Sequence, residues 1–191
     1  MATAEKSLIV LGVTGGIACY KAADLCSKLV QHGYEVQVIM TENSRQFVSK
    51  LTFQTLSRNA VVCGVFDTPE VWKPEHVALA ERAALLVVAP CTANFIGKFA
   101  SGIADDALTT FAITRRSPVL LAPAMNPAMW SNPAVEANCA TLRKRGINFI
   151  GPNSGHVACG ENTNPGRMSE PLEILSAVQA LIPAKAELPN L

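Results

Sequence analysis

The stretch Leu8-Ile-Val-Leu-Gly-Val-Thr-Gly-Gly-Ile17 joins an unbroken apolar run to a turn rich in glycine. The run Leu8–Val13 predicts a strand that is buried on both faces, as the strands of parallel sheets are. In the following segment, Ile17–Gln31, apolar residues recur at helical spacing, and the segment stops before Gly33, which suits a helix C-terminal cap. A strand, a glycine turn and a helix in this order predict the first unit of an α/β fold.

The same alternation continues along the chain. Amphipathic runs predict two more helices at Asp105–Thr114 and Ala134–Arg145, and Val61–Val65 is either an extra strand or a buried connector. Further apolar runs predict strands at Val36–Met40, Leu85–Ala89, Val119–Leu121 and Asn148–Ile150. We therefore expect an α/β protein with a single Rossmann-like (flavodoxin-like) three-layer domain and a mostly parallel sheet.

Length and composition fit one compact domain. The 191 residues suggest a domain over 1–182 and a loose tail at 183–191, where two prolines stand in a stretch without periodicity. Hydrophobic residues make up 49% of the chain but aromatic residues only 6%, so the core must consist of small aliphatic side chains. The 16 basic and 15 acidic residues nearly balance, which argues against nucleic-acid binding through a basic face.

The low share of charged residues, 16%, also favours a surface that is partly covered by other subunits, so we expect a homo-oligomer. The longest apolar stretches, such as Ala83–Pro90, are far shorter than the roughly 18 residues that span a bilayer. No secretory signal is visible at Met1–Lys6, and a cytoplasmic location is expected by default.

The six cysteines include no C-x-x-C pair, so we expect neither a metal site nor a disulfide framework. Most of them fit buried core positions. Cys159 does not, because it lies in the polar, glycine-punctuated loop Gly155–Met168. This loop is either a lid that carries a thiol to a substrate or an ordinary surface connection.

Ligands of parallel α/β sheets bind in the loops at the carboxyl ends of the strands. In the first of these loops, Gly15, Gly16 and Ile17 either expose backbone N–H groups to a phosphate or simply form a tight turn. The spacing is not that of a dinucleotide-binding fingerprint and fits a mononucleotide better.

The later loops carry hydroxyl and amide groups. Thr41, Thr92 and Asn94 can cap the following helix or hold the polar edge of a ligand. In Met125-Asn126, a soft apolar side chain precedes an amide that either binds a carboxylate or caps the next helix. His76 is a candidate base, although a lone histidine is also often structural.

These residues together resemble the flavin-containing cysteine decarboxylases, and most closely the phosphopantothenoylcysteine decarboxylase branch, over about Leu8 to Leu181. The motifs that carry the resemblance are Gly12-Val-Thr-Gly-Gly-Ile-Ala18 with Tyr20-Lys21, Glu75-His-Val-Ala-Leu-Ala80, Pro90-Cys-Thr-Ala-Asn94, Gly102-Ile-Ala-Asp105, Pro123-Ala-Met-Asn-Pro-Ala-Met-Trp130, and Ala158-Cys-Gly160 with Pro165-Gly-Arg-Met168.

The resemblance implies FMN bound between the subunits of a trimer, often within a dodecamer. It implies cofactor binding by Gly15, Gly16, Ile17, Thr41, Thr92, Ala93, Asn94 and Met125. It also implies catalytic roles: His76 as the active-site histidine, Asn126 as the carboxylate binder, and Cys159 as the cysteine that completes reduction. Since the lantibiotic peptidyl-cysteine branch lacks that cysteine, its presence implies decarboxylation of 4'-phosphopantothenoylcysteine to 4'-phosphopantetheine in coenzyme A biosynthesis.

The residue types suit this chemistry. An alkyl carboxylate loses carbon dioxide only into an electron sink, which neither histidine nor asparagine provides, so a cofactor is required. Oxidation of the substrate thiol would create a C=S sink, with His76 as base, Asn126 orienting the carboxylate, and Cys159 supplying a proton in the final reduction.

Two features depart from the family pattern. Phe95 replaces a common threonine, and the spacing from Cys159 to Arg167 is slightly longer than usual. In many bacteria the domain is fused to the synthetase that makes its substrate, and here we expect that synthetase to be a separate chain. The alternatives are a lantibiotic-type peptidyl-cysteine decarboxylase, a flavin-binding electron carrier, and a non-catalytic flavin-binding scaffold.

Overall fold

The computed structural model of the chain describes residues 6–64, 75–155 and 164–183, with the backbone alone at 75–78. Within these ranges, five strands form a single sheet in which every pair is parallel. The strands are β1 (Leu8–Val13), β2 (Glu35–Met40), β3 (Ala83–Cys91), β4 (Val119–Pro123) and β5 (Asn148–Phe149), in the spatial order β2-β1-β3-β4-β5. The predicted flavodoxin-like α/β fold is confirmed.

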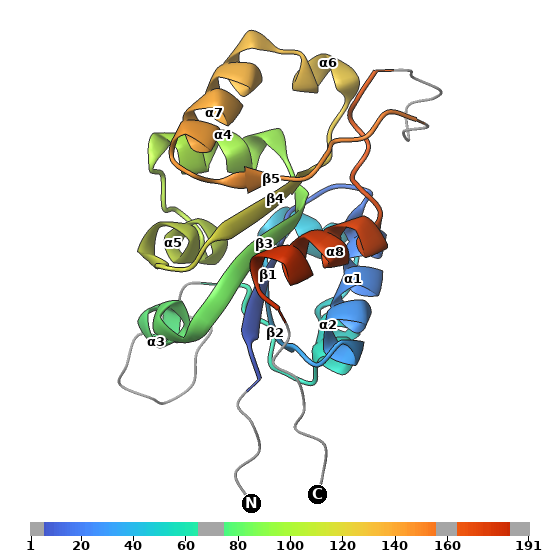
Figure 1. Ribbon diagram of the computed structural model, residues 1–191, viewed down its shortest axis with the longest axis vertical. Helices are drawn as coiled ribbons and strands as arrows, with labels where there is room; N and C mark the ends of the chain where they lie inside the picture. The colour runs from blue at the N-terminus through green and yellow to red at the C-terminus, as the bar shows by residue number, and fades with distance from the viewer. Residues whose placement is uncertain (1–5, 65–74, 156–163, 184–191) are drawn as a thin grey trace, which may run out of the picture.

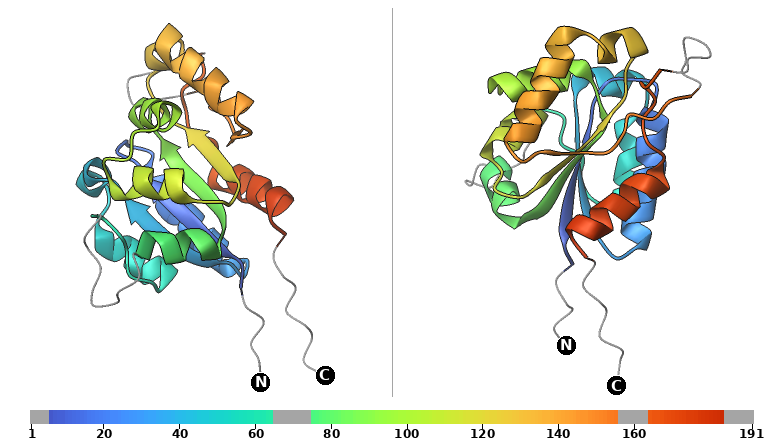
Figure 2. Two further views of the ribbon diagram at one scale, coloured as in Figure 1. Left: turned by 90° about the vertical axis from the view of Figure 1, so that its left-hand side faces the viewer. Right: turned by 45° about the horizontal axis from the view of Figure 1, so that its top comes forward.

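Helices cover both faces of the sheet, which gives three layers (Figure 1). One face carries α1 (Cys19–Gln31), α2 (Lys50–Ser57) and α8 (Pro171–Leu181). The other carries α3 (Glu75–Arg82), α4 (Ala93–Ser101), α5 (Ala107–Thr114) and α7 (Pro133–Lys144), as the two further views in Figure 2 also show. Two short helices, η1 (Glu42–Gln46) and α6 (Pro127–Trp130), follow β2 and β4 at their carboxyl ends.

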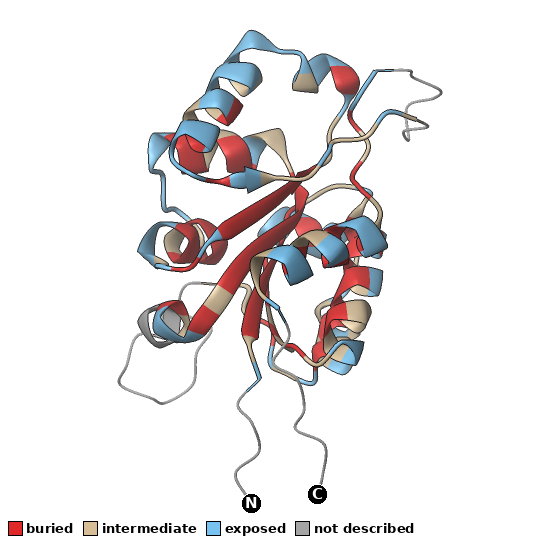
Figure 3. Cartoon of the chain, in the orientation of Figure 1, coloured by how far each residue is buried: buried red, intermediate tan, exposed pale blue. Residues whose placement is uncertain are grey.

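The core consists of two apolar clusters, one on each face of the sheet. Leu25 of α1 and Ile174 of α8 belong to the first cluster, whereas Phe95 of α4 and Phe111 of α5 belong to the second. Between them, every residue of β1 and β4 is buried, and the strands form the continuous buried centre of Figure 3. Because the strands are covered on both sides, polar groups can gather only at their ends.

The predicted helices and strands occur with small shifts at their ends. Helix α1 begins two residues after Ile17, and α5 begins at Ala107 because Asp106 caps it. The sequence analysis placed no helices at α2, α3, α4, α6 or α8. The segment 61–64 is a connector in which Val61 is buried and the other residues are half-buried; it pairs with β2 through a bridge of Val62 to Ile39, and residue 65 lies outside the described residues.

The buried-cysteine prediction is confirmed for Cys19, Cys26, Cys91 and Cys139. Burial raises the pKa of Cys26 to about 12, so this thiol stays protonated near neutral pH. Cys159, most of the predicted lid and residues 184–191 of the predicted tail lie outside the described residues. No helix in the described ranges is long and apolar enough to span a bilayer.

Candidate active site

A cavity of about 950 Å³ lies at the carboxyl ends of the strands. The loops after β1, β2, β3 and β4 line it, together with the segment Gly166–Met168. All of the predicted cofactor-binding residues line this one cavity, and so does Asn126: Gly15, Gly16, Ile17, Thr41, Thr92, Ala93, Asn94 and Met125. The strand order reverses between β1 and β3, which is where ligands of open α/β sheets bind.

Thr14, which the sequence analysis did not single out, joins the loops after β1 and β3. Its side-chain hydroxyl donates to the carbonyl oxygen of Pro90 at 2.7 Å and accepts from the backbone N–H of Thr92 at 3.1 Å. The residue is only 2% exposed. These bonds fix the two loops against each other in a low-dielectric setting, where an unpaired donor would be costly. Its position directly after a buried strand is the signal that could have identified it.

The two glycines of the first loop have different surroundings. A Cβ atom on Gly15 would lie 2.5 Å from the Cβ of Asn43, whereas one on Gly16 would meet nothing within 4 Å. Gly15 is therefore required by the close packing of two loops, and Gly16 leaves room in the cavity. Within the described residues, no hydrogen bond uses the backbone N–H groups of Gly15, Gly16 or Ile17, so these donors are available to a ligand.

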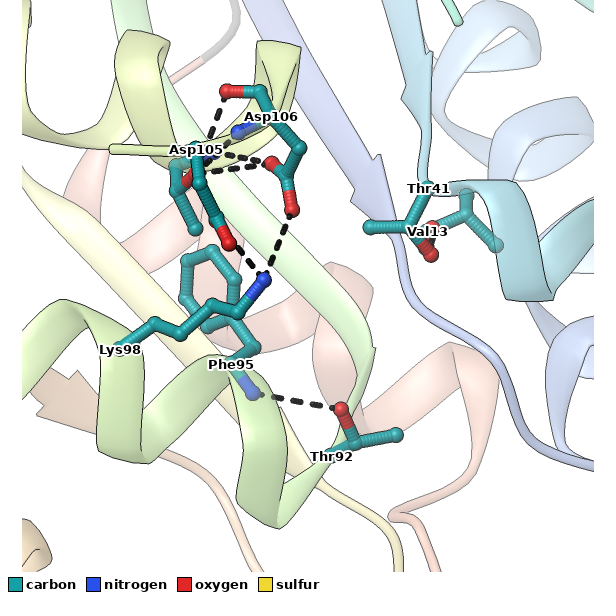
Figure 4. Close-up of polar contacts among 8 residues, drawn as sticks. Val13, Thr41, Thr92, Phe95, Lys98, Asp105 and Asp106 are labelled. Atoms are coloured by element: carbon teal, nitrogen blue, oxygen red, sulfur yellow. Dashed lines mark hydrogen bonds and ion pairs between the residues drawn. The ribbon is translucent and has the colours of Figure 1, made fainter. Parts of the chain in front are cut away.

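Thr92 lines the cavity and also caps a helix (Figure 4). Its hydroxyl accepts from the N–H of Phe95 at 3.4 Å, so the capping interpretation is confirmed for this residue. Thr41 stands at the start of η1, and its hydroxyl donates to the carbonyl of Val13 at 3.4 Å rather than capping that helix. The Phe95 ring packs against Phe99 with 5.6 Å between the ring centres. A core aromatic side chain therefore occupies the position where the family pattern has a threonine.

Asn126 is the N-cap of α6. Its side-chain oxygen accepts from the N–H of Ala128 at 2.8 Å, which fixes the orientation of the amide. The Nδ2 group makes no hydrogen bond within the described residues and remains a donor at the edge of the cavity. The capping interpretation is thus confirmed, and the same geometry leaves the group that a carboxylate needs.

The segment Gly166–Met168 packs directly on the loop that carries Asn126. The N–H of Met125 donates to the carbonyl of Gly166 at 3.0 Å, and a Cβ on Gly166 would lie 2.5 Å from the Met125 carbonyl oxygen. A backbone bond from Asn153 to the Arg167 carbonyl, 2.7 Å long, closes the base of the loop 153–167. Only glycine at position 166 allows this approach.

Two ionic clusters flank the cavity. In the first, drawn in Figure 4, Lys98 of α4 lies 2.7 Å from Asp105 and 3.6 Å from Asp106, which caps α5. The hydrogen bond from Lys98 lowers the pKa of the Asp105 carboxyl. In the second, Lys21 of α1 lies 2.8 Å from Glu170, and Arg167 pairs with the same carboxylate. The sequence analysis assigned no role to either cluster, and the second forms only because Lys21 and Glu170, distant in sequence, meet in the fold.

Of the three predicted catalytic residues, the described part of the structure places one, Asn126, at the cavity. His76 falls in α3, which Figure 1 shows beside the amino end of β3, away from the strand ends that line the cavity; its side chain is not described. Cys159 lies outside the described residues. Of the three, only Asn126 is seen at the cavity.

The chain belongs to the Flavoprotein family, whose model matches residues 2–183. Among curated relatives, it is 48% identical over 171 residues to the coenzyme A biosynthesis bifunctional protein CoaBC of Bacillus subtilis, covering 90% of this chain and 42% of the relative. It is 43% identical over 184 residues to the protein of the same name from Mycolicibacterium smegmatis, covering 96% and 44%.

Two solved structures are similar in fold. A cysteine-to-serine mutant of a PPC decarboxylase complexed with pantothenoylaminoethenethiol matches with a TM-score of 0.81 and 31% identity, over 92% of this chain and 98% of that one. The FMN-binding protein AtHal3 matches with a TM-score of 0.80 and 32% identity, over 93% and 97%. The chain spans less than half the length of the curated relatives named above, and because they are bifunctional they do not support the expected separate synthetase chain.

Proposed function

We propose that this chain is an FMN-dependent decarboxylase that converts 4'-phosphopantothenoylcysteine to 4'-phosphopantetheine. One observation carries the proposal: the cofactor-binding residues expected for this activity and Asn126 line a single cavity at the strand ends. The relatives that share the fold and the family include proteins named for coenzyme A biosynthesis and for PPC decarboxylation.

The residues around the cavity fit FMN. Its volume lies within the range of about 300–1,000 Å³ that small-molecule sites occupy. Free backbone N–H groups at Gly15–Ile17 suit a phosphate, and Thr41, Thr92 and Asn94 offer hydroxyl and amide groups for the polar edge of a flavin. When bound, the flavin would supply the two-electron chemistry that creates an electron sink on the substrate.

The chain's own residues then bind, orient and move protons. The free Nδ2 group of Asn126 would donate to the substrate carboxylate and align the bond that breaks. His76 would take up the proton, and Cys159 would give one back in the last step. A thiol can do this because its ordinary pKa is close to neutrality, about 8.5.

We also propose that the active enzyme is a homo-oligomer, built from trimers. Three large apolar side chains at the cavity are about half exposed or more: Ile17 at 60%, Tyr20 at 61% and Met129 at 48%. Such a rim suits contact with another subunit. The distance of α3 from the strand ends fits an arrangement in which His76 of the partner subunit completes the site. Light scattering at micromolar concentration checks this, and a monomer would contradict it.

The function is tested by incubating the purified yellow holoenzyme with 4'-phosphopantothenoylcysteine and measuring product mass. We expect loss of the mass of carbon dioxide with no net redox change. With Cys159→Ser, we expect oxidation and decarboxylation to occur once, leaving an enethiol product, because a serine hydroxyl is too weak an acid to replace the thiol. His76→Asn should stop before decarboxylation.

Failure to decarboxylate 4'-phosphopantothenoylcysteine would reject the function, and two further results would each contradict one part of the proposal. Release of FAD or NAD on denaturation would contradict the cofactor. Normal saturated aminothiol from Cys159→Ser at the wild-type rate would make Cys159 a bystander. Decarboxylation of a peptide with a C-terminal cysteine, in place of the pantothenoyl substrate, would instead favour the peptidyl-cysteine alternative.

A further inference from the structure

Lys21 and Arg167 form a cationic wall on one side of the cavity. Both side chains line the cavity, whereas Glu170, the carboxylate that they share, does not. The Lys21 side chain is 11% exposed and that of Arg167 is 40% exposed. From inside the cavity, a ligand therefore meets the two cations in front and the anion behind them.

The acidic groups near this wall already have bonding partners. Glu170 is held by Lys21, whose hydrogen bond lowers the pKa of that carboxyl, and by Arg167. Glu173 accepts from the backbone N–H of Glu170 at 2.7 Å and from Asn153 at 2.9 Å, at the start of α8. The acidic side chains that do line the cavity, Glu42 and Asp106, belong to η1 and to the cap of α5.

Both cations keep donors free. Lys21 has three N–H donors and Arg167 has five, and within the described residues the bonds that their side chains donate go to Glu170. The planar fork of arginine matches two oxygens of a phosphate, and a nearly buried ammonium adds a point charge whose field is little screened. Glu170 fixes both side chains in advance, which reduces the entropy that a ligand must overcome.

Through Arg167, the wall adjoins the loop of Asn126, while Lys21 lies in the first turn of α1. Arg167 directly follows Gly166, whose carbonyl accepts from the N–H of Met125. A ligand that places its carboxylate at Asn126 would therefore lie along this wall.

We propose that Lys21 and Arg167 form the specificity subsite for the second anionic group of the substrate, a phosphate monoester. This inference rests on the proposed function, in which Asn126 takes the carboxylate at the opposite end of the same molecule. The phosphate would add contacts to Arg167 and Lys21 without taking part in the chemistry, so it would act on substrate affinity.

The test compares kcat/KM for pantothenoylcysteine with and without its 4'-phosphate, in holoenzyme carrying Arg167→Gln. We expect the preference of the wild type for the phosphorylated substrate to fall about 10- to 100-fold, the range for losing a hydrogen bond to a charged group. The change should lie in KM, with kcat kept, and Arg167→Lys should recover part of the preference.

Arg45→Gln is the matched control. Arg45 forms an ion pair with Glu42, three residues away, as Arg167 does with Glu170, but Arg45 does not line the cavity. The substrate preference of Arg45→Gln should therefore equal that of the wild type. FMN content and Tm are measured for every variant, because these report the fold and the cofactor site.

Three outcomes overturn the inference. If Arg167→Gln leaves the preference unchanged, because kcat/KM stays the same or falls equally for both substrates, the cluster only holds α1 and α8 together. Loss of FMN in Arg167→Gln assigns the cluster to the cofactor. A wild type that does not distinguish the substrates has no phosphate subsite. If the wild type decarboxylates neither substrate, it is the proposed function that fails.

Discussion

The two sides of the cavity are held together by different kinds of contact. On the side of β1 and β3, Thr14 joins consecutive loops of the sheet through buried hydrogen bonds. On the side of β4, the backbone of Gly166 packs directly against the backbone of Met125. The neighbouring ion pair of Arg167 and Glu170 is partly exposed. The hydrogen bonds of Thr14 should be insensitive to salt and pH, whereas the ion pairs of Arg167 and Glu170 should respond to both, because exposed ion pairs are screened.

Asn126→Asp should have the largest effect on activity and almost none on the fold. Asparagine and aspartate cap helices equally well, so α6 should keep its cap and Tm should stay the same. A carboxylate facing the substrate carboxylate costs several kcal/mol in a desolvated site, so kcat/KM should fall about 1,000-fold. Steady-state decarboxylation measures this; a fall of less than tenfold would mean that Asn126 does not meet the carboxylate.

Gly166→Ala tests the close packing on the β4 side. The added Cβ would lie 2.5 Å from a backbone oxygen, so the loop of Met125 must shift, at a cost of about 1–3 kcal/mol. We expect kcat to fall while FMN remains bound. Gly97→Ala is the control, since its Cβ makes only an ordinary contact at 3.6 Å. Equal activity in the two variants would show that the loop of Met125 can shift without loss of activity.

Thr14→Val tests the hydrogen bonds on the other side. The valine has nearly the same shape but leaves the N–H of Thr92 without its acceptor, which should reduce the free energy of unfolding by about 1–3 kcal/mol. Chemical denaturation measures it, and the loss should be the same at low and high salt. A salt-dependent loss would contradict the contrast between the two sides.

Glu170→Gln should have the smallest effect. Lys21 lowers the pKa of this carboxyl from its ordinary value of 4.5, so its contribution to stability is present above that value and is lost as the pH falls through the lowered pKa. Exposed pairs contribute about 0–1 kcal/mol, so Tm should drop slightly at pH 7 and by less at pH 3. An equal drop at both pH values would assign the effect to packing.

Most of the first side could be predicted from the sequence, because each of its residues directly follows an apolar strand. Gly15, Thr41 and Thr92 were found in this way, since parallel strands bring their carboxyl ends to one edge. Periodicity alone missed α2, α3, α4 and α6, which have few turns over which a pattern can repeat, and it also missed the 11-residue α8. Helix α4 is an example: it is only nine residues long and nearly half of it is buried.

The second side could not be predicted from local pattern. Arg167 and Lys21 lie far apart in sequence and meet only because α8 packs beside α1. The contact of Gly166 with Met125 likewise joins segments about forty residues apart. Roles for His76 and Cys159 came from the family resemblance, and they remain predictions.

The start of β1 and the end of α8 lie side by side at the edge opposite the cavity (Figure 1). The Tyr34 hydroxyl donates to the carbonyl of Ile182 at 2.7 Å, and the neighbouring Glu35 N–H donates to Ser7 at 3.1 Å, so one turn before β2 anchors both ends. The described chain therefore enters and leaves on the side of the sheet away from the cavity. Affinity tags, fluorescent reporters or tandem modules can be attached there without crowding the route by which small molecules enter.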